Sequence, residues 1–208
     1  MTVEAITYPR GTRVLVWRLD EEVSQLLELC HEIGISCGDL LDLPPKRQRE
    51  KAAERLLLCH AFGHPVALSH TSQGAPFIDG VEVNISITHT MRLVALALND
   101  TQIIGLDAEQ VDRPQVLKVR NKFLNACEQQ FIAPDDLAAH IIAWTAKEAI
   151  IKAERNSALD WTDGISLEPF NAGKEEITFD ACCACRRYSL FVRRVDAHFL
   201  TLALPLLP

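Results

Sequence analysis

Two carboxylates stand two residues apart in the segment 104–109, which reads Ile-Gly-Leu-Asp-Ala-Glu. Because strand residues two apart share a face, Asp107 and Glu109 are predicted to point to the same side of a strand end. Neighbouring carboxylates repel each other unless a proton or a cation lies between them. Oxygen-only ligands suit a hard cation such as Mg²⁺, which also binds phosphates. The pair therefore indicates either a cation site or a solvated strand end.

A third carboxylate and a lysine share one helical face further along the chain. The segment 144–152 reads Trp-Thr-Ala-Lys-Glu-Ala-Ile-Ile-Lys, with Glu148 and Lys152 four residues apart. Side chains at that spacing are neighbours on a helix. Glu148 could add a third ligand, and Lys152 could meet an anion beside the cation. The alternative is a plain surface ion pair, against which the tryptophan within this charged stretch argues.

Two further groups of side chains suit phosphate binding. Thr88, His89 and Thr90 follow an alternating segment and offer two hydroxyls and an imidazole as hydrogen-bond donors. Arg49 and Arg55 lie on a predicted helix, and arginine makes forked contacts with phosphate. The alternatives are a turn with a packed histidine and an ordinary amphipathic helix surface.

Composition narrows the function classes. The chain has 208 residues, 48% of them hydrophobic and 24% charged, which is ordinary for a globular protein. Its formal net charge of −7 argues against an extended basic face for nucleic acid. No apolar run approaches the ~18 residues that a membrane span needs. Without an export signal, we expect a cytoplasmic protein with reduced thiols, in which Cys182, Cys183 and Cys185 are incidental.

Hydrophobic periodicity predicts the same order of elements in both halves, namely strand, two helices, then antiparallel strands. The first half has predicted strands at 13–19, 81–88 and 93–98 and helices at 21–31 and 46–62. The second half has predicted strands at 103–108, 176–179, 188–193 and 198–204 and helices at 115–131 and 137–154. This order predicts an α+β fold of two similar lobes, residues 1–100 and 101–208, with a site in the groove between them.

Four short patterns in this order resemble one family. They are Asn-Ile-Ser-Ile-Thr-His-Thr, Gly-Leu-Asp-Ala-Glu, Phe-Leu-Asn-Ala-Cys-Glu-Gln-Gln-Phe and Trp-Thr-Ala-Lys-Glu-Ala-Ile-Ile-Lys. Each is weak alone, but together they are similar to the 4′-phosphopantetheinyl transferases of the surfactin-synthetase-activating type. The clear match covers residues 81–152, and the family's pseudo-dimeric fold agrees with the two predicted lobes.

The resemblance implies a reaction and its participants. The phosphopantetheine arm of coenzyme A would move to a serine of an apo acyl or peptidyl carrier protein, with Mg²⁺ or Mn²⁺, leaving adenosine 3′,5′-bisphosphate. We expect a monomer that binds neither nucleic acid nor membrane. The alternatives are a Mg²⁺-dependent nucleotide pyrophosphate hydrolase and a carrier-binding relative without catalysis.

The resemblance also implies roles for individual residues. The metal-ligand positions carry Asp107, Glu109 and Glu148. The proposed general base falls on Glu128, and the lysine near the pyrophosphate falls on Lys152. The coenzyme A contacts fall on Thr88, His89 and Thr90 and on Arg49 and Arg55.

Two features bear on how the substrates would be held. Ala75 stands where many relatives have lysine, which removes one cation from the coenzyme A site. The segment 113–123 carries Arg113, Lys118, Arg120 and Lys122 among apolar residues, and we expect it to dock an acidic carrier protein.

Overall fold

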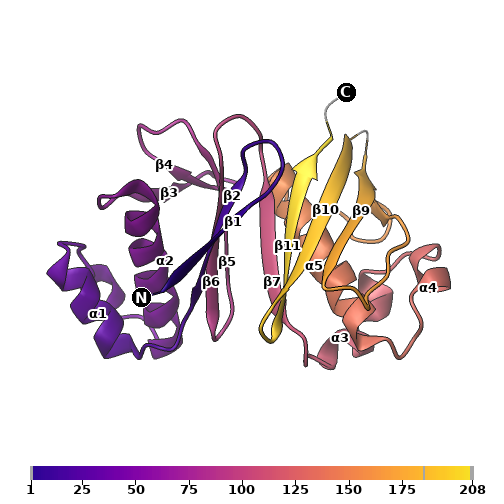
Figure 1. The fold of residues 1–208 in the computed structure, drawn as a ribbon, viewed down its shortest axis with the longest axis horizontal. Coiled ribbons are helices and arrows are strands. Elements are labelled where there is room, and N and C mark those ends of the chain that lie inside the picture. The colour runs from indigo at the N-terminus through magenta and orange to yellow at the C-terminus, as the bar shows by residue number, and fades with distance from the viewer. Residues whose placement is uncertain (1, 185, 207–208) are drawn as a thin grey trace.

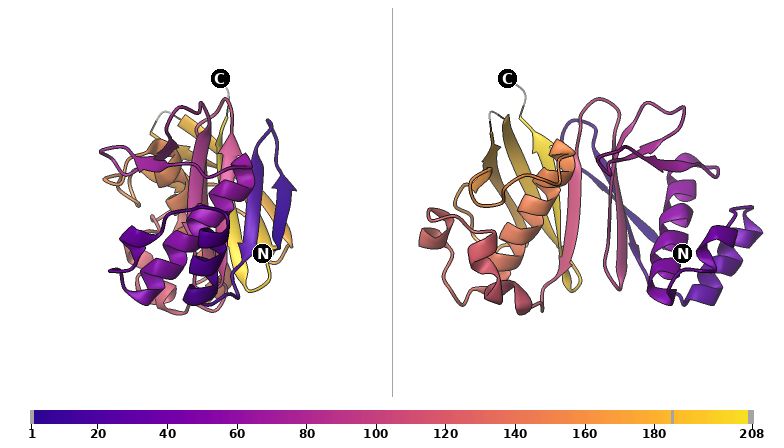
Figure 2. Two further views of the ribbon diagram at one scale, coloured as in Figure 1. Left: turned by 90° about the vertical axis from the view of Figure 1, so that its left-hand side faces the viewer. Right: turned by 180° about the vertical axis from the view of Figure 1, so that it is seen from behind.

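The computed structural model describes residues 2–184 and 186–206, so Cys185 lies outside the described residues. The fold is α+β, with antiparallel sheets packed against helices, as predicted. Figure 1 shows helices at the two outer sides and two sheets between them. The rear view in Figure 2 shows α5 lying along the outer face of the second sheet. None of the described helices is long and apolar enough to cross a membrane.

The first sheet has the strand order β1-β2-β6-β5. Helices α1 and α2 cover its outer face, and a small hairpin of β3 and β4 lies beside it. The bounds of these elements are β1 Val3–Thr7, β2 Arg13–Arg18, α1 Val23–Glu32, the 3-10 turn η1 Gly38–Leu40, α2 Pro45–Phe62, β3 Leu68–His70, β4 Pro76–Ile78, β5 Asn84–His89 and β6 Leu93–Asn99.

The second sheet has the order β7-β11-β10-β9-β8, and α5 packs across β7 and β11. Its elements are β7 Gly105–Gln110, α3 Gln115–Lys118, η2 Arg120–Lys122, α4 Glu128–Phe131, α5 Leu137–Glu154, β8 Ile165–Leu167, β9 Glu176–Cys183, β10 Arg186–Val195 and β11 His198–Pro205. The strands of the two sheets are connected in the same way. In each, the strand before the helices (β2 or β7) pairs antiparallel with the last strand of that half (β6 or β11). The boundary near residue 100 stays a prediction.

Alternating side chains in the central strands contribute to two hydrophobic cores, one on each face of the first sheet. On β2, Leu15 and Trp17 point to the core under α1 and α2, whereas Val14 and Val16 point to a core between the two sheets. Strand β6 divides its residues in the same way. Because both faces are buried, these strands are continuously apolar. The molecule is therefore layered as helices, sheet, sheet, helices.

Side-chain hydroxyls join the facing edges of β5 and β7, which we call the seam. The Leu106 N–H donates to Ser86 Oγ at 2.9 Å, and the Ala108 N–H donates to Thr88 Oγ1 at 3.1 Å. Each bond pairs an edge-strand donor that would otherwise be buried without an acceptor. The polar positions of the alternating segment thus serve to join the sheets.

The structure confirms the helix predicted at 137–154 and corrects two other predictions. The helix predicted over 115–131 is wrong, because this stretch forms only α3, η2 and α4. Asn125 Oδ1 accepts the Glu128 N–H at 2.9 Å, a local bond that competes with helix continuation. The strand predicted at 81–88 begins only at Asn84, and the sequence analysis missed β1, β3, β4 and β8.

Gly105 marks the closest approach of α5 to β7. A Cβ at this position would overlap the backbone carbonyl of Ala149. Overpacking that only a backbone shift can relieve costs about 3 kcal/mol. Gly105→Ala should therefore lower the free energy of unfolding by at least about that amount in urea melts. Gly38→Ala, where nothing lies within 4 Å of the added Cβ, is the matched control. Equal effects of the two changes would contradict this packing.

His198 gives the fold a predicted pH dependence. It is buried at the start of β11, its Nε2 lies 3.0 Å from Thr90 Oγ1, and burial lowers its pKa. The Val195 carbonyl, Asp196 and Asp112 oppose this shift, and Arg92 adds to it.

Because the unfolded chain takes up this proton more readily, stability is full above the unfolded pKa of about 6.5 and falls as the pH drops below it, by up to about 1.4 kcal/mol per pH unit. His198→Gln should flatten the dependence of the unfolding free energy between pH 7.5 and 5.5. The same change at exposed His31 should not, and an unchanged slope in His198→Gln would refute the assignment.

Candidate active site at the seam

A cavity of about 350 Å³ lies beside the seam, between α2, the β3–β4 hairpin, β5 and α5. We call it the seam cavity. Three residues predicted from sequence line it, namely His89, Glu148 and Lys152. Helix α5 supplies the last two because they are one turn apart and face β5 and β7. The structure therefore gathers predicted residues from the two halves of the chain around one cavity.

Lys152 occupies the centre of the seam. Its ammonium donates to the Leu106 carbonyl at 2.9 Å and to Asp107 Oδ1 at 2.8 Å, and more weakly to the Ile87 carbonyl at 3.4 Å. The lysine therefore contacts both edge strands and one predicted metal ligand. About a third of its side chain stays exposed, at 31%, so it also faces the cavity.

Thr88 is buried and belongs to the seam. Its hydroxyl donates to Asp107 Oδ1 at 3.2 Å while it accepts the Ala108 N–H. Thr90 is held in a similar way, since its hydroxyl contacts His198 and accepts the Arg92 N–H at 3.2 Å. Both hydroxyls therefore position the loop around His89, and neither is among the residues that line the cavity.

The three predicted metal ligands lie on the neighbouring elements β7 and α5, and two of them form ion pairs with cations of the chain. Asp107 pairs with Lys152, and Glu109 pairs with Arg113. Burial and the nearby Asp107 raise the pKa of Glu148, so two of the carboxylates interact electrostatically. Within residues 2–184 and 186–206, no group of three or more His, Cys, Asp or Glu side chains is arranged to hold a metal ion.

The chemistry of these acids nevertheless suits Mg²⁺. All three are oxygen donors, and the mutual repulsion that contributes to the raised pKa of Glu148 is the condition that a bound cation relieves. A metal site here requires the carboxylates to exchange their contacts with Lys152 and Arg113 for the ion.

His89 lies at the cavity wall with about a third of its side chain exposed. Burial lowers its pKa, and Lys152 and Arg47 lower it further, whereas Glu50 and Glu54 oppose the shift. Its Nε2 lies 3.3 Å from Glu50 Oε2. A mainly neutral imidazole can donate one hydrogen bond, either to Glu50 or to a ligand in the cavity.

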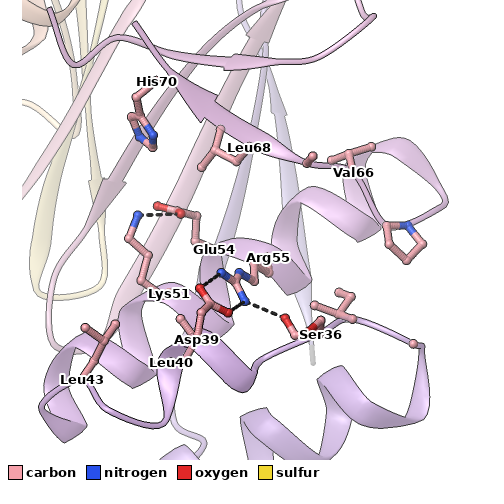
Figure 3. Close-up of a pocket in the computed structure, with 14 residues that line it drawn as sticks. Ser36, Asp39, Leu40, Leu43, Lys51, Glu54, Arg55, Val66, Leu68 and His70 are labelled. Carbon is pink, nitrogen blue, oxygen red and sulfur yellow. Dashed lines mark hydrogen bonds and ion pairs between the residues drawn. The ribbon is translucent and has the colours of Figure 1, made fainter. Parts of the chain in front are cut away.

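The structure places Arg49 and Arg55 outside the seam cavity. Arg49 donates to three backbone carbonyls, those of Leu19, Glu21 and Met91, and so ties α2 to two loops. Arg55 lines a neighbouring pocket of about 650 Å³, which we call the N-terminal pocket (Figure 3). This pocket shares Lys51, Glu54 and His70 with the seam cavity. There it makes a forked ion pair with Asp39, at 2.6 and 2.9 Å.

Cavity residues that the sequence analysis missed are Lys51, His70 and Arg155. Lys51 lies one turn before Arg55 on α2, and its partner is Glu54 at 2.9 Å. Arg155 ends α5 in the left-handed conformation and donates to Asn84 Oδ1 at 3.0 Å. The cavity wall contains three cationic side chains, those of Lys51, Lys152 and Arg155. It also contains two carboxylates, those of Glu54 and Glu148. Ala75 also lies in the wall, and His70 is near it. No local sequence pattern marks Lys51, His70 or Arg155, because they reach the cavity from three different elements, α2, β3 and the end of α5.

Glu128 is fully buried and forms an ion pair with Lys147 at 2.7 Å. Its carboxylate also accepts the N–H groups of Asn125 and Leu167. Lys147 donates in addition to the carbonyls of Trp161 and Ile165. The pair holds α4, α5 and β8 together, and this packing leaves no open approach for a serine hydroxyl. The general-base assignment of Glu128 stays a prediction.

The segment 113–123, predicted to dock a carrier protein, is partly buried in the core. Its apolar residues Val116 and Phe123 are buried, and Phe123 packs edge-on against Trp144. Arg113, Lys118 and Lys122 are exposed. Arg113 also lies over the Trp144 ring at 5.6 Å while it pairs with Glu109, which links this segment to the predicted ligands.

Lys147→Met should destabilise the chain strongly. The change leaves the Glu128 carboxylate buried without a cation, which typically costs 3–5 kcal/mol, so we expect about that loss in the free energy of unfolding. Urea denaturation measures it, with Lys122→Met at an exposed site as control. A loss below about 1 kcal/mol would show that the buried pair is not important for stability.

Comparison with known proteins supports the motif assignment in one half of the chain. Residues 103–203 match the family model of the 4′-phosphopantetheinyl transferase superfamily. A search of curated proteins found no match. The matched stretch contains β7 and α5 and thus Asp107, Glu148 and Lys152, together with nearly all of the second sheet. This part of the chain is therefore similar to the 4′-phosphopantetheinyl transferase superfamily.

Proposed function

We propose that this chain is a phosphopantetheinyl transferase of the surfactin-synthetase-activating type. It would move the 4′-phosphopantetheine group of coenzyme A to a serine of an apo carrier protein and release adenosine 3′,5′-bisphosphate. The observation that carries the proposal is the seam cavity, whose Glu148 and Lys152 come from the stretch similar to this superfamily. The cavity is polar at the seam and has an apolar wall from Ile85 and Ile151, as an amphipathic substrate requires.

In this proposal Lys152 is the cation that meets the pyrophosphate. Two strand carbonyls would keep it in place when Asp107 turns from the lysine to the metal. Lys51 and Arg155 would bind further phosphate oxygens from opposite walls. They would supply the positive charge that is missing at Ala75, which stands in the cavity wall where many relatives have lysine. His89 would donate a hydrogen bond from the loop that Thr88 and Thr90 position.

Asp107, Glu109 and Glu148 would hold Mg²⁺. The ion, when bound, neutralises charge on the phosphates. The chain's own part is to hold three carboxylates on two rigid elements, β7 and α5, where Gly105 allows close packing. Arg113, released from Glu109, would face the carrier protein with Lys118 and Lys122.

The serine proton needs an acceptor at the seam cavity, where the carboxylates in the wall are Glu54 and Glu148. A carboxylate cannot deprotonate an alcohol beforehand, but it can accept the proton as the bond to phosphorus forms. Full burial and the ion pair with Lys147 favour a positioning role for Glu128. Through Lys147 it would fix Trp161 and Ile165, and with them the loop that follows Arg155 in the cavity wall.

The proposal predicts transfer in a minimal assay. The chain, coenzyme A, Mg²⁺ and an apo carrier protein should give a carrier heavier by one phosphopantetheine group on intact-mass analysis. Asp107→Asn should lower the single-turnover rate at least about 100-fold, because metal-ion charge stabilisation is worth several kcal/mol. Asp100→Asn, at an exposed turn, is the matched control and should react like the wild type.

Three outcomes would contradict the proposal. Full activity in Asp107→Asn would remove the metal assignment. Release of adenosine bisphosphate without any carrier protein would indicate a pyrophosphate hydrolase. Coenzyme A binding without transfer to several carrier proteins would indicate a binding relative without catalysis, in which the ion pairs of Asp107 and Glu109 are permanent.

A further inference from the structure

Three cysteines gather beside the N-terminal pocket, away from the seam. Cys30 lies in the last turns of α1 and is fully buried, whereas Cys37, in the loop before η1, and Cys59, on α2, are half-buried. Cys37 packs against the same core that contains Cys30. The proposed transfer reaction uses none of these thiols.

The backbone brings Cys37 back to Cys30. Gly34, with φ of +75°, reverses the chain after α1, and the Ile35 N–H donates to the Cys30 carbonyl at 2.8 Å. The Leu40 N–H donates to the Cys37 carbonyl at 3.0 Å and so fixes the start of η1. The Cys30 thiol donates to the Ala52 carbonyl on α2 at 3.9 Å, one turn before Arg55, which holds Ser36 next to Cys37. Burial raises the pKa of Cys30 to about 12, and the nearby Cys37 thiol adds to this shift.

Arg55 completes the surroundings of Cys37. Its guanidinium donates to the Ser36 carbonyl and to both oxygens of Asp39, so a cation lies beside Cys37. Figure 3 shows Ser36, Asp39 and Arg55 together at the wall of the N-terminal pocket. A partly exposed thiol beside a cation is the setting in which protein cysteines react with oxidants. Cys30 is shielded from solvent near Cys37 in the same core, which is the place of a resolving thiol.

We propose that Cys30 and Cys37 are an oxidation site, a dithiol that hydrogen peroxide converts to an intramolecular disulfide. The Cys37 sulfur attacks one peroxide oxygen, the O–O bond breaks, and a sulfenic acid and one water form. The Cys30 sulfur then attacks the Cys37 sulfur and displaces a second water. Two thiols and one peroxide thus give one disulfide and two waters, and a dithiol reductant reverses the change.

The disulfide would tie the end of α1 to the loop that presents Asp39 to Arg55. Oxidation would therefore act on the wall of the N-terminal pocket, whereas the seam between β5 and β7 contains none of these cysteines. The inference does not depend on the proposed transfer reaction, because it concerns other residues and is read without an activity assay.

Peptide mapping of the full chain tests the proposal. Residues 19–46 form one tryptic peptide that contains both Cys30 and Cys37, whereas Cys59 and Cys127 fall on other peptides. The folded chain is treated with hydrogen peroxide, unfolded, and alkylated before digestion. We expect this peptide to be lighter by two hydrogens than the unoxidised peptide, to carry no alkyl group, and to regain two alkylation sites after dithiothreitol.

Variants make the test specific. Cys59→Ser should leave the result unchanged, and Cys37→Ser should leave Cys30 alkylatable at the same peroxide dose. Exposed Cys127 should stay alkylatable at the dose that removes both sites from the 19–46 peptide. The proposal is overturned if Cys37 is driven to sulfinic acid while Cys30 stays free, if Cys37 pairs with Cys59 or another chain, or if both thiols remain alkylatable.

Discussion

The arrangement depends on one partly buried cation, Lys152. Lys152 reaches from α5 between the facing edges of β5 and β7 and donates to a carbonyl of each strand and to Asp107. The hydroxyls of Ser86 and Thr88 satisfy the remaining edge donors. These contacts set the spacing of the two sheets, and with it the cavity between α2, β5 and α5. A lysine predicted to meet a phosphate is thus also the residue that joins the two halves.

Lys152 thus has both a structural and a proposed functional role, and this explains which features could be predicted from the sequence and which could not. Local periodicity located α5 and the central strands, because their side chains alternate between two cores. Helical spacing predicted that Glu148 and Lys152 share a face, and the structure places both near Asp107. The partners of Thr88, Arg49 and Glu128 could not be predicted, because each bonds to groups distant in sequence or to backbone atoms. For the same reason Lys51 and Arg155 were overlooked.

Charge balance at the seam follows from these contacts. Asp107 and Glu109 are neutralised by Lys152 and Arg113, while Glu148 responds to its neighbours with a raised pKa. A metal ion would therefore compete with two side-chain cations, and its binding would free both of them next to the substrates. The buried Glu128–Lys147 pair lies on the other side of α5, where it holds the helix against α4 and β8. Helix α5 thus carries both the Lys152–Asp107 pair of the proposed active site and the structural Lys147–Glu128 pair.

A crystal structure of the chain with coenzyme A and Mg²⁺ tests the central claim most directly. The account predicts that the pyrophosphate lies in the seam cavity against Lys152, with the metal between it and the carboxylates of Asp107, Glu109 and Glu148. Coenzyme A bound only in the N-terminal pocket, or a seam in which Lys152 and Asp107 keep their contacts while the ligand lies elsewhere, would contradict it.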